Sequence, residues 1–412
     1  MTKSNCQKII NFVQKNQTML TILYRFCSYQ TANKLLNFFL RSKLRFLVNR
    51  HSLLPNTFGK INQTNRFHSY VSVLVLVGLL FLSIANVSAQ EAKYKIATVA
   101  FYNSENLFDT IDEPNVKDEE FTPQGSKRWN TKKYNIKLAH LSEVISKIGV
   151  DKAQEPPAIL GISEVENISV LKDLINTPKL KPYNYHIIHY DSPDRRGIDV
   201  ALLYRPKYFK VIDSKSYRLT VPDKKDFRTR DQLLVSGLLD GEQIYFIVNH
   251  WPSRYGGEKR SRPLRNDAAD LCRSIADSLL KVDANAKVIM MGDLNDDPVD
   301  PSLKNHLKAT DDKSLLSKGY FYNPMITLYK EGIGSLAWHD SWNLFDNMIL
   351  TPALLKDSGY HFYQAHVFNK KFITTDEGRY KGYPFRTFSG DNFIGGYSDH
   401  FPVYLFLVKK IN

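Results

Sequence analysis

The sequence predicts an α/β fold in which two mixed or antiparallel β-sheets pack together and are covered by helices. Short apolar runs between turn clusters outnumber helical patterns, which indicates a strand-rich chain. Two of these runs meet across Asp240-Gly241, a strong hairpin signal that favours antiparallel pairing. No linker or internal repeat divides residues 90–412, so two packed sheets in a single domain are the simplest arrangement.

The expected strands are runs rich in β-branched and aromatic residues, bounded by turn residues. They are Ile96–Tyr102, Ile159–Ser163, Tyr185–His189, Val200–Tyr204, Leu233–Leu239, Ile244–Asn249, Val288–Met291, Met348–Leu350 and Val403–Leu407. Two segments instead repeat apolar residues at helical spacing. They are Thr131–Ile148 and Leu264–Leu280.

Residues 1–89 form a basic amino-terminal extension that ends in a predicted signal peptide. The extension has 11 Lys and Arg residues and no Asp or Glu. Its apolar core, about residues 70–85, is shorter than the roughly 20 residues that a membrane span needs. Val87-Ser88-Ala89 is typical of a cleavage site, so we expect export to the periplasm or the medium without stable membrane insertion. An uncleaved anchor with a cytoplasmic tail is the alternative. The long segment before the apolar core is either an over-extended start or a true extension.

Charge and cysteine content narrow the classes of protein. The net charge is +14, and the amino-terminal extension accounts for all but +3 of it. Recognition of a polyanion by the remaining chain must therefore depend on a local site. Cys272 is the one cysteine after residue 89, which excludes an internal disulfide and a cysteine-rich zinc site there.

Six polar clusters flank the predicted strands, where a rigid sheet can present reactive side chains. They are 101–109, 161–167, 249–254, 291–297, 345–350 and 398–403. Together they supply carboxylates, amides and two imidazoles. Oxygen ligands of this kind favour Mg²⁺, with Mn²⁺ or Ca²⁺ as alternatives.

Five of these segments, in order, resemble the endonuclease/exonuclease/phosphatase superfamily. They read Phe-Tyr-Asn-Ser-Glu-Asn-Leu-Phe-Asp, Ser-Glu-Val-Glu-Asn, Asn-His-Trp-Pro-Ser-Arg, Gly-Asp-Leu-Asn-Asp and Ser-Asp-His-Phe-Pro. The resemblance covers roughly residues 94–408. It implies a four-layer α/β/β/α sandwich and a metal-dependent phosphodiesterase.

The resemblance also implies which residues lie near the metal ion. Glu164 corresponds to the metal-binding glutamate, Asn106 to the asparagine near the metal, and Asp399 to a second metal-side carboxylate.

On the phosphate side, the resemblance implies that Asp293 and Asn295 align the attacking water and the phosphate. His400 corresponds to the histidine that contacts the scissile phosphate, and Asp346 to the acid that orients it.

His250 occupies the position of the second histidine in the deoxyribonuclease branch, where it would act as a general acid. Asp199 is a candidate to orient His250, or else only a strand cap. Arg230, or its neighbour Arg228, matches an arginine position used for phosphate contact.

A basic stretch follows His250 and is a candidate phosphate-binding surface. It consists of Arg254, Arg262 and Arg265. A solvated surface without this role is the alternative.

The expected function is that of a monomeric nuclease that cuts DNA, and RNA as an alternative. A lipid-head-group enzyme, either a sphingomyelinase or a phosphoinositide phosphatase, is the competing hypothesis. The Trp-Cys-Asp-Arg segment typical of the phosphatases is absent, since Phe345-Asp-Asn-Met stands there. The sequence also shows no convincing exposed apolar hairpin of the kind that a sphingomyelinase favours. A binding protein without catalysis is disfavoured because every expected catalytic residue type is present.

Overall fold

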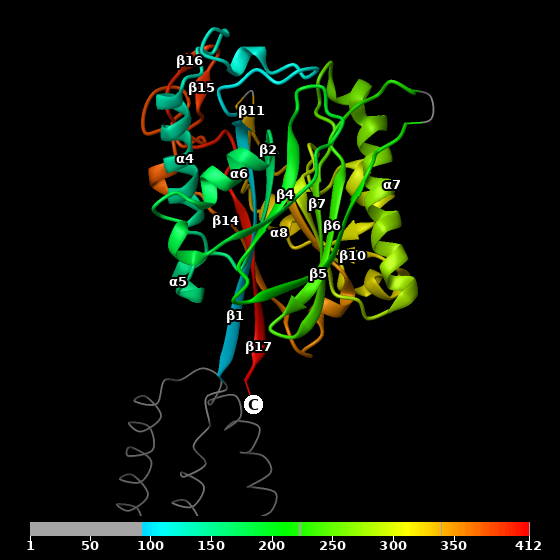
Figure 1. Cartoon of the computed structure of the whole chain (residues 1–412). Helices are drawn as coiled ribbons and strands as arrows, with labels where there is room; N and C mark the ends of the chain where they lie inside the picture. The colour runs from blue at the N-terminus through cyan, green and yellow to red at the C-terminus, as the bar shows by residue number, and fades with distance from the viewer. Residues whose placement is uncertain (1–92, 222–223, 339, 412) are drawn as a thin grey trace, which may run out of the picture. The chain divides into compact units, whose positions relative to one another are not determined.

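The computed structural model describes residues 93–221, 224–338 and 340–411. The predicted signal peptide and its cleavage site lie outside the described residues. Element labels follow Figure 1. In the described part of the chain, no helix combines the length and hydropathy needed to cross a bilayer.

Two large sheets hold most of the strands (Figure 1). The first has the order β14-β17-β1-β2-β4-β3, and the second β5-β6-β7-β8-β13-β10-β9. The strands of the first sheet are β1 (Tyr94–Leu107), β2 (Ile159–Val165), β3 (His186–His189), β4 (Asp199–Tyr204), β14 (His361–Val367) and β17 (Val403–Lys410). Those of the second are β5 (Phe209–Tyr217), β6 (Gln232–Leu239), β7 (Glu242–His250), β8 (Val288–Asp293), β9 (Ala309–Thr310), β10 (Phe321–Tyr322) and β13 (Asp346–Leu350).

Helices cover the outer faces of the two sheets, and two small hairpins complete the fold. The helices on these faces are α4 (Thr131–Ile145), α5 (Val150–Ala153), α6 (Ile168–Ile175) and α7 (Glu258–Val282). The short helix α8 (Met325–Lys330) instead packs against the apolar core between the sheets. The hairpins are β11 (Leu336–Trp338) with β12 (Ser341–Asn343), and β15 (Phe388–Ser389) with β16 (Asn392–Phe393). Single 3-10 or π turns occupy Glu119–Phe121, Lys181–Tyr183, Ser302–Leu307, Lys313–Lys318, Pro352–Leu355 and Lys371–Ile373.

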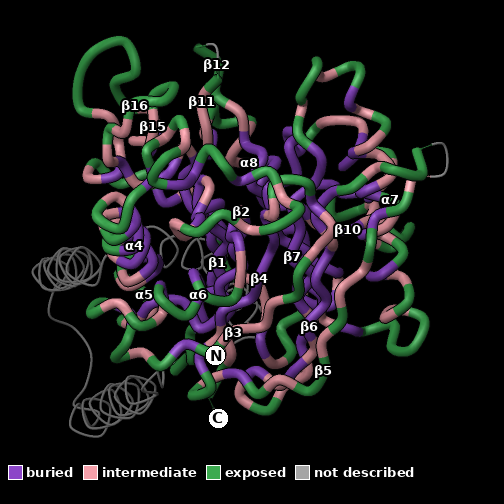
Figure 2. Tube along the Cα trace, turned by 45° about the horizontal axis from the view of Figure 1, so that its top comes forward, coloured by how far each residue is buried: buried purple, intermediate pink, exposed green. Residues whose placement is uncertain are grey.

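Three buried apolar clusters show that the layers are stacked as α/β/β/α. One joins α4 and α6 to the first sheet, where Leu141 and Leu171 pack. The second lies between the sheets and contains Phe246 and Leu405. The third lies beneath α7 and contains Cys272. The buried segments run through the interior of the trace in Figure 2. The predicted four-layer sandwich is therefore confirmed, and Cys272 is a buried core residue.

Each predicted strand and both predicted helices are present, with shifted ends. In the predicted hairpin, Leu239 pairs with Glu242 across a two-residue turn. Asp240 (φ 46°) and Gly241 (φ 83°) are both left-handed there, as a type I′ turn requires. The helix α7 begins at Glu258, six residues before the predicted start at Leu264. Pro263 lies near this start and removes only one backbone hydrogen bond, so the helix continues through it.

The strands β5 and β14 were not predicted. Both lie at sheet edges, where exposed polar residues interrupt the apolar alternation that identifies a strand. Edge position thus explains why their sequences do not read as half-buried strands.

Strand direction brings the polar clusters to one end of both sheets. The strands β1 and β2 are parallel, as are β7 and β8, so the clusters that follow them emerge together. The strands β13 and β17 run antiparallel to these neighbours and begin at the same end. In register, Asp293 lies opposite both His250 and Asp346. The pairing pattern therefore builds the candidate site.

Candidate active site

Asn103 connects the two sheets at the centre of this end. It is buried at the end of β1, and its Nδ2 atom donates to Asp293 Oδ2 at 3.0 Å. The same atom lies 3.4 Å from Glu164 Oε1 on β2. Asn106, the asparagine expected at the metal, instead contacts Glu164 Oε2 through its backbone N–H at 3.0 Å. Asn103 stands in the same motif, directly after the predicted strand, so the sequence carried the signal for it.

The chain adopts left-handed backbone at four polar positions of this site. They are Glu105, Asn106, Glu164 and Asn295, with φ between 51° and 58°. Such conformations are costly for residues other than glycine and are retained where the surrounding fold imposes them, often at functional sites. The backbone therefore places these polar groups at a local energetic cost.

His400 and Asp346 form a buried pair. The His400 Nδ1–H donates to Asp346 Oδ2 at 2.7 Å, and Ser335 Oγ donates to the same carboxylate oxygen. Burial opposes charge on the imidazole, but the carboxylates of Asp346 and Asp293 outweigh it and raise the pKa of His400 well above its usual value. The two carboxylates therefore favour the protonated form of His400. Its Nε2 lies 3.9 Å from Asp293 Oδ2.

His250 is a second imidazole that faces the Asp293 carboxylate. Its Nε2 lies 3.6 Å from Asp293 Oδ2 and 3.8 Å from Glu164 Oε1. Burial, together with the positive charges of Arg230, Arg196 and His400, lowers the pKa of His250 well below its usual value. This environment favours the neutral form of His250, which must accept a proton before it can act as the expected general acid.

The expectation that Asp199 orients His250 is wrong. Asp199 accepts hydrogen bonds from His189 Nε2 and from the Ser192 backbone N–H, each at 2.9 Å. In the antiparallel pair β3–β4, His189 lies opposite Ala201, so Asp199 is its diagonal neighbour. The His250 Nδ1 atom is buried without a hydrogen-bond partner among the described residues.

Asp293 carries much of the buried negative charge of the site. Burial, joined by the nearby carboxylates of Asp346 and Glu164, raises the pKa of Asp293 to about 7, although His400 opposes the shift. The Asn295 backbone N–H donates to Asp293 Oδ1 at 3.0 Å, and its side chain donates to the backbone carbonyl of Trp251.

The donor chemistry of the site fits a hard divalent cation. The amide of Asn103 lies between the carboxylates of Glu164 and Asp293 and contacts both. Asp399, expected on the metal side, has its Oδ1 atom 3.9 Å from His400 Nε2. Carboxylate and amide oxygens of this kind are the ligands that Mg²⁺ accepts, and the partial exposure of Glu164 and Asp399 leaves them accessible to an ion. Glu164 and Asp399 would hold the ion, with Asn103 beside it.

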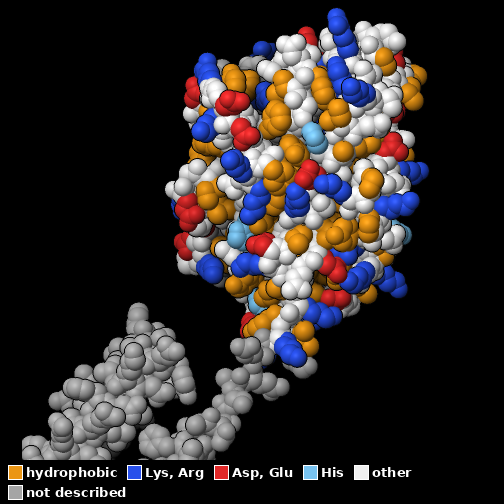
Figure 3. Space-filling model, turned by 90° about the vertical axis from the view of Figure 1, so that its left-hand side faces the viewer, with side chains coloured by type: hydrophobic (Ala, Val, Ile, Leu, Met, Phe, Trp, Pro, Cys, Tyr) orange, Lys and Arg blue, Asp and Glu red, His pale blue; other side chains and the backbone are white. Residues whose placement is uncertain are grey.

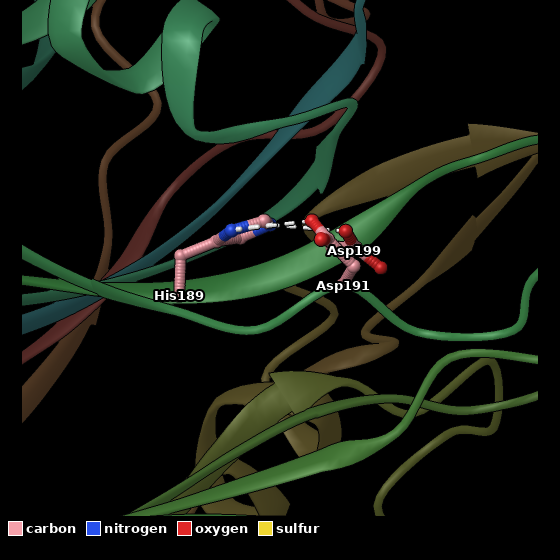
Figure 4. A group of neighbouring side chains, drawn as sticks. All are labelled: His189, Asp191 and Asp199. Atoms are coloured by element: carbon pink, nitrogen blue, oxygen red, sulfur yellow. Dashed lines mark hydrogen bonds and ion pairs between the residues drawn. The ribbon is translucent and has the colours of Figure 1, made fainter. Parts of the chain in front are cut away.

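A second acidic group brings ligand atoms of His189, Asp191 and Asp199 within 4.8 Å of one another (Figure 4). Its geometry suits a structural pair better than a metal centre. His189 Nε2 already bonds to Asp199, and the Asp191 side chain is 90% exposed and 3.8 Å from Nδ1. We interpret the cluster as a hydrogen-bonded pair that fixes the ends of β3 and β4.

The predicted arginine surface after His250 is wrong in its main feature, because internal carboxylates engage the guanidinium groups. Arg265 is fully buried, with its Nε 2.7 Å from Asp296 Oδ1. Arg254 Nη2 lies 2.7 Å from Asp300 Oδ2, and Arg262 pairs with Glu258 one helical turn away.

Arg230 is also buried, and its contacts are internal. Its guanidinium donates to Asp194 Oδ2 at 3.1 Å and to the Trp251 carbonyl at 2.6 Å. Arg230 therefore holds two loops of the site in place, and it does not lie on an open phosphate-binding surface.

We expect Arg265→Ala to lower the free energy of unfolding by about 3–5 kcal/mol, since it removes the fully buried cation next to Asp296 and leaves this buried carboxylate with the partly exposed Arg254. Arg262→Ala, in an exposed pair, should leave the free energy of unfolding nearly unchanged. Urea unfolding of both variants measures the difference. A fully stable Arg265→Ala protein with a raised KM would restore the substrate-binding role.

Two arginines that the sequence did not single out lie at the rim of the site. Arg196 Nη1 donates to Asn106 Oδ1 at 3.3 Å, and Arg386 Nη2 donates to Asp399 Oδ2 at 3.2 Å. Both stand in loops with no periodic pattern, so sequence spacing gave no signal for them.

The structure also places an exposed aromatic hairpin beside the site, which the sequence analysis did not find. Trp338 on β11 is 61% exposed, and Trp342 on β12 stacks on Phe401 next to His400. Each strand has only three residues, too short for an alternating pattern to stand out.

The four-layer fold, with buried carboxylates and two imidazoles at one end of the sheets, defines a metal-dependent phosphoesterase. The model of the Endonuclease/Exonuclease/phosphatase family matches residues 98–409, and the chain belongs to that family. It is therefore a hydrolase of a family whose enzymes depend on divalent metals.

The chain is similar to several solved structures. An endonuclease/exonuclease/phosphatase family protein from Bacteroides thetaiotaomicron is 19% identical, with a TM-score of 0.47 over 78% of this chain and 100% of that one. A mannosyl-6-phosphatase from the same organism is 19% identical (TM-score 0.46; 76% and 99% covered). Truncated Caenorhabditis elegans TDP2 is 15% identical (TM-score 0.46; 76% and 97% covered). No curated protein matches the chain.

Proposed function

We propose that the protein is an exported, Mg²⁺-dependent nuclease that hydrolyses phosphodiester bonds of DNA with little sequence preference. One observation carries the proposal. The Nε2 atoms of two buried imidazoles face the same oxygen of Asp293, that of His250 at 3.6 Å and that of His400 at 3.9 Å, and only His400 is paired with a second buried carboxylate, that of Asp346. This arrangement offers a proton acceptor and a cation to the same bound phosphate.

The side chains divide the work of hydrolysis. The phosphodiester is anionic, so the His400 imidazolium, held by Asp346, stabilises the charge that develops on a phosphoryl oxygen. Asp293 takes a proton from the attacking water, and neutral His250 then takes that proton and delivers it to the leaving oxygen. A divalent ion near Glu164 would supply Lewis acidity to the phosphate.

A substrate panel tests the proposal. The processed protein, expressed from its full-length sequence, is assayed with Mg²⁺, Mn²⁺ or Ca²⁺ on duplex DNA, RNA, sphingomyelin and phosphoinositides. We expect nucleic acid to be hydrolysed at least about tenfold faster than either lipid. Equal or faster lipid hydrolysis would overturn the nuclease assignment.

A lipid-head-group phosphodiesterase is the second candidate, and the β11–β12 hairpin favours it. The exposed side chain of Trp338 beside the site could enter a bilayer interface, where tryptophan is favoured. The same panel with vesicles separates the two functions. Cosedimentation with sphingomyelin vesicles that is lost in Trp338→Ala would support the lipid substrate.

We also predict cleavage after Ala89, so that the exported protein begins at Gln90. The short apolar core and the Val87-Ser88-Ala89 sequence motivate this prediction. Amino-terminal sequencing of the protein from its native host reads the new end. A membrane-bound product that retains residues 70–85 would contradict it.

We expect Asp346→Asn to shift the alkaline limb of the kcat/KM profile to lower pH. The Asp346 carboxylate raises the pKa of His400, so its removal lets His400 lose its proton at lower pH. Ser335→Ala keeps the carboxylate and should shift the limb less. An unchanged alkaline limb in Asp346→Asn would show that activity does not depend on protonated His400.

A further inference from the structure

Two rim arginines stand at the ends of a continuous set of polar contacts across the site. Arg196 reaches Asn106, which contacts Glu164 through its backbone. Arg386 reaches Asp399 at the other end, beside His400. Arg196 is exposed, and the Arg386 side chain is 41% exposed. Both guanidinium groups are therefore accessible at the edge of a buried catalytic floor.

The backbone that carries Arg196 is held in place. The Arg196 backbone N–H donates to Asp194 Oδ1 at 2.9 Å, and the Gly197 N–H donates to the Asp194 carbonyl at 3.2 Å. Buried Arg230 fixes Asp194 through its second carboxylate oxygen at 3.1 Å. The turn at Asp194–Gly197 is thus anchored, while the Arg196 side chain points from it to the rim.

The backbone at Arg386 is anchored by a separate network. The neighbouring Thr387 N–H donates to buried Glu105 Oε2 at 2.7 Å, and buried Lys137 donates to the Thr387 hydroxyl. The Gly396 N–H donates to the Arg386 carbonyl at 3.0 Å. Anchored backbones reduce the entropy lost when such side chains bind a ligand.

We propose that Arg196 and Arg386 bind the backbone phosphates on either side of the scissile phosphate of a nucleic-acid strand. The scissile phosphate would lie on the floor, where His250, Asp293 and His400 are 2–7% exposed. This inference rests on the proposed nuclease function. It specifies the neighbouring backbone phosphates as the part of the substrate that the two arginines bind. The resting contacts of both arginines are single and partly exposed, so exchanging them for a bidentate phosphate contact is favourable.

The charge on the surface outside the site supports local binding by Arg196 and Arg386, which together we call the arginine clamp. In the face of the molecule shown in Figure 3, acidic and basic side chains are interspersed. The chain after residue 89 carries only +3, so a general basic surface would attract DNA weakly. Arg265, in the basic stretch after His250, is bound internally and is not available to neighbouring phosphates.

The test compares a polynucleotide with a substrate that has a single phosphate. Arg196→Ala, Arg386→Ala and the double variant are assayed on DNA and on bis(p-nitrophenyl) phosphate, with Arg262→Ala as the matched control. Each single variant should raise the KM for DNA about tenfold and reduce the slope of log KM against log salt by about one. The KM for bis(p-nitrophenyl) phosphate should change by a clearly smaller factor than the KM for DNA, and Arg262→Ala should match wild type on both substrates.

Binding provides a second readout. In a His400→Ala background, fluorescence anisotropy with Ca²⁺ should show the same loss of DNA affinity for both arginine variants. An equal loss on bis(p-nitrophenyl) phosphate would assign the arginines to the scissile phosphate and overturn the clamp. Unchanged DNA kinetics would overturn it as well. If wild-type protein hydrolyses bis(p-nitrophenyl) phosphate but not DNA, the proposed function fails, and the clamp fails with it.

Discussion

Replacing His400 by alanine is expected to lower kcat by about 10²–10⁴-fold while leaving the fold intact. His400 is the one imidazole that combines a 2.7 Å hydrogen bond to a buried carboxylate with a raised pKa in the described site. Its loss removes the positive charge that would stabilise the phosphoryl oxygens in the transition state. Single-turnover rates on duplex DNA at saturating Mg²⁺ measure the effect.

His306→Ala is the matched control, because His306 is partly exposed and pairs with Asp270 on α7, outside the described site. It should cut DNA like wild type. Circular dichroism must show that His400→Ala is folded. A folded His400→Ala protein with less than a tenfold loss of kcat would mean that this pair does not stabilise the reaction.

The second large effect is expected for Glu164→Gln. The carboxylate accepts a hydrogen bond from the Asn106 backbone at 3.0 Å and lies beside Asn103, so glutamine preserves its shape but removes its charge. Because a hard cation binds anionic oxygens most strongly, the Mg²⁺ concentration for half-maximal activity should rise and kcat/KM should fall on the order of 10²-fold. Activity measured across a Mg²⁺ titration, after EDTA treatment and dialysis, gives both values.

Glu120→Gln removes an acid that is 48% exposed and should leave the Mg²⁺ dependence unchanged. Full activity of the EDTA-treated wild-type protein would refute a metal requirement. An unaltered Mg²⁺ curve for Glu164→Gln would instead place the ion elsewhere, and Asp399 would be the next residue to replace.

The sequence predicted the layers because the burial of each helix and strand produces a pattern of apolar residues within that segment of the sequence. Leu141 and Val144 repeat at helical spacing and face the first sheet, and the run at Val288 is apolar because both faces of β8 are covered. The edge strands β5 and β14 escaped prediction because exposure at an edge removes that pattern.

Sequence also indicated which motifs carry chemistry, since carboxylates and imidazoles follow strands that end at the same side of the sheets. The sequence could not show which asparagine of the first motif contacts Asp293. Asn103 and Asn106 are three residues apart in one motif, and only the left-handed turn at Glu105 and Asn106 decides which side chain reaches Asp293.

By itself, then, the sequence determined the α/β sandwich, the family resemblance and the residue types of the site, because each depends on local periodicity or on the order of motifs. Only the tertiary structure decided the partners of the charged groups. Arg265 meets Asp296, and Asp199 meets His189, through contacts set by helix packing and strand register. A charged side chain is stabilised by whichever opposite charge the fold brings within a few ångströms, and the linear sequence does not contain that distance.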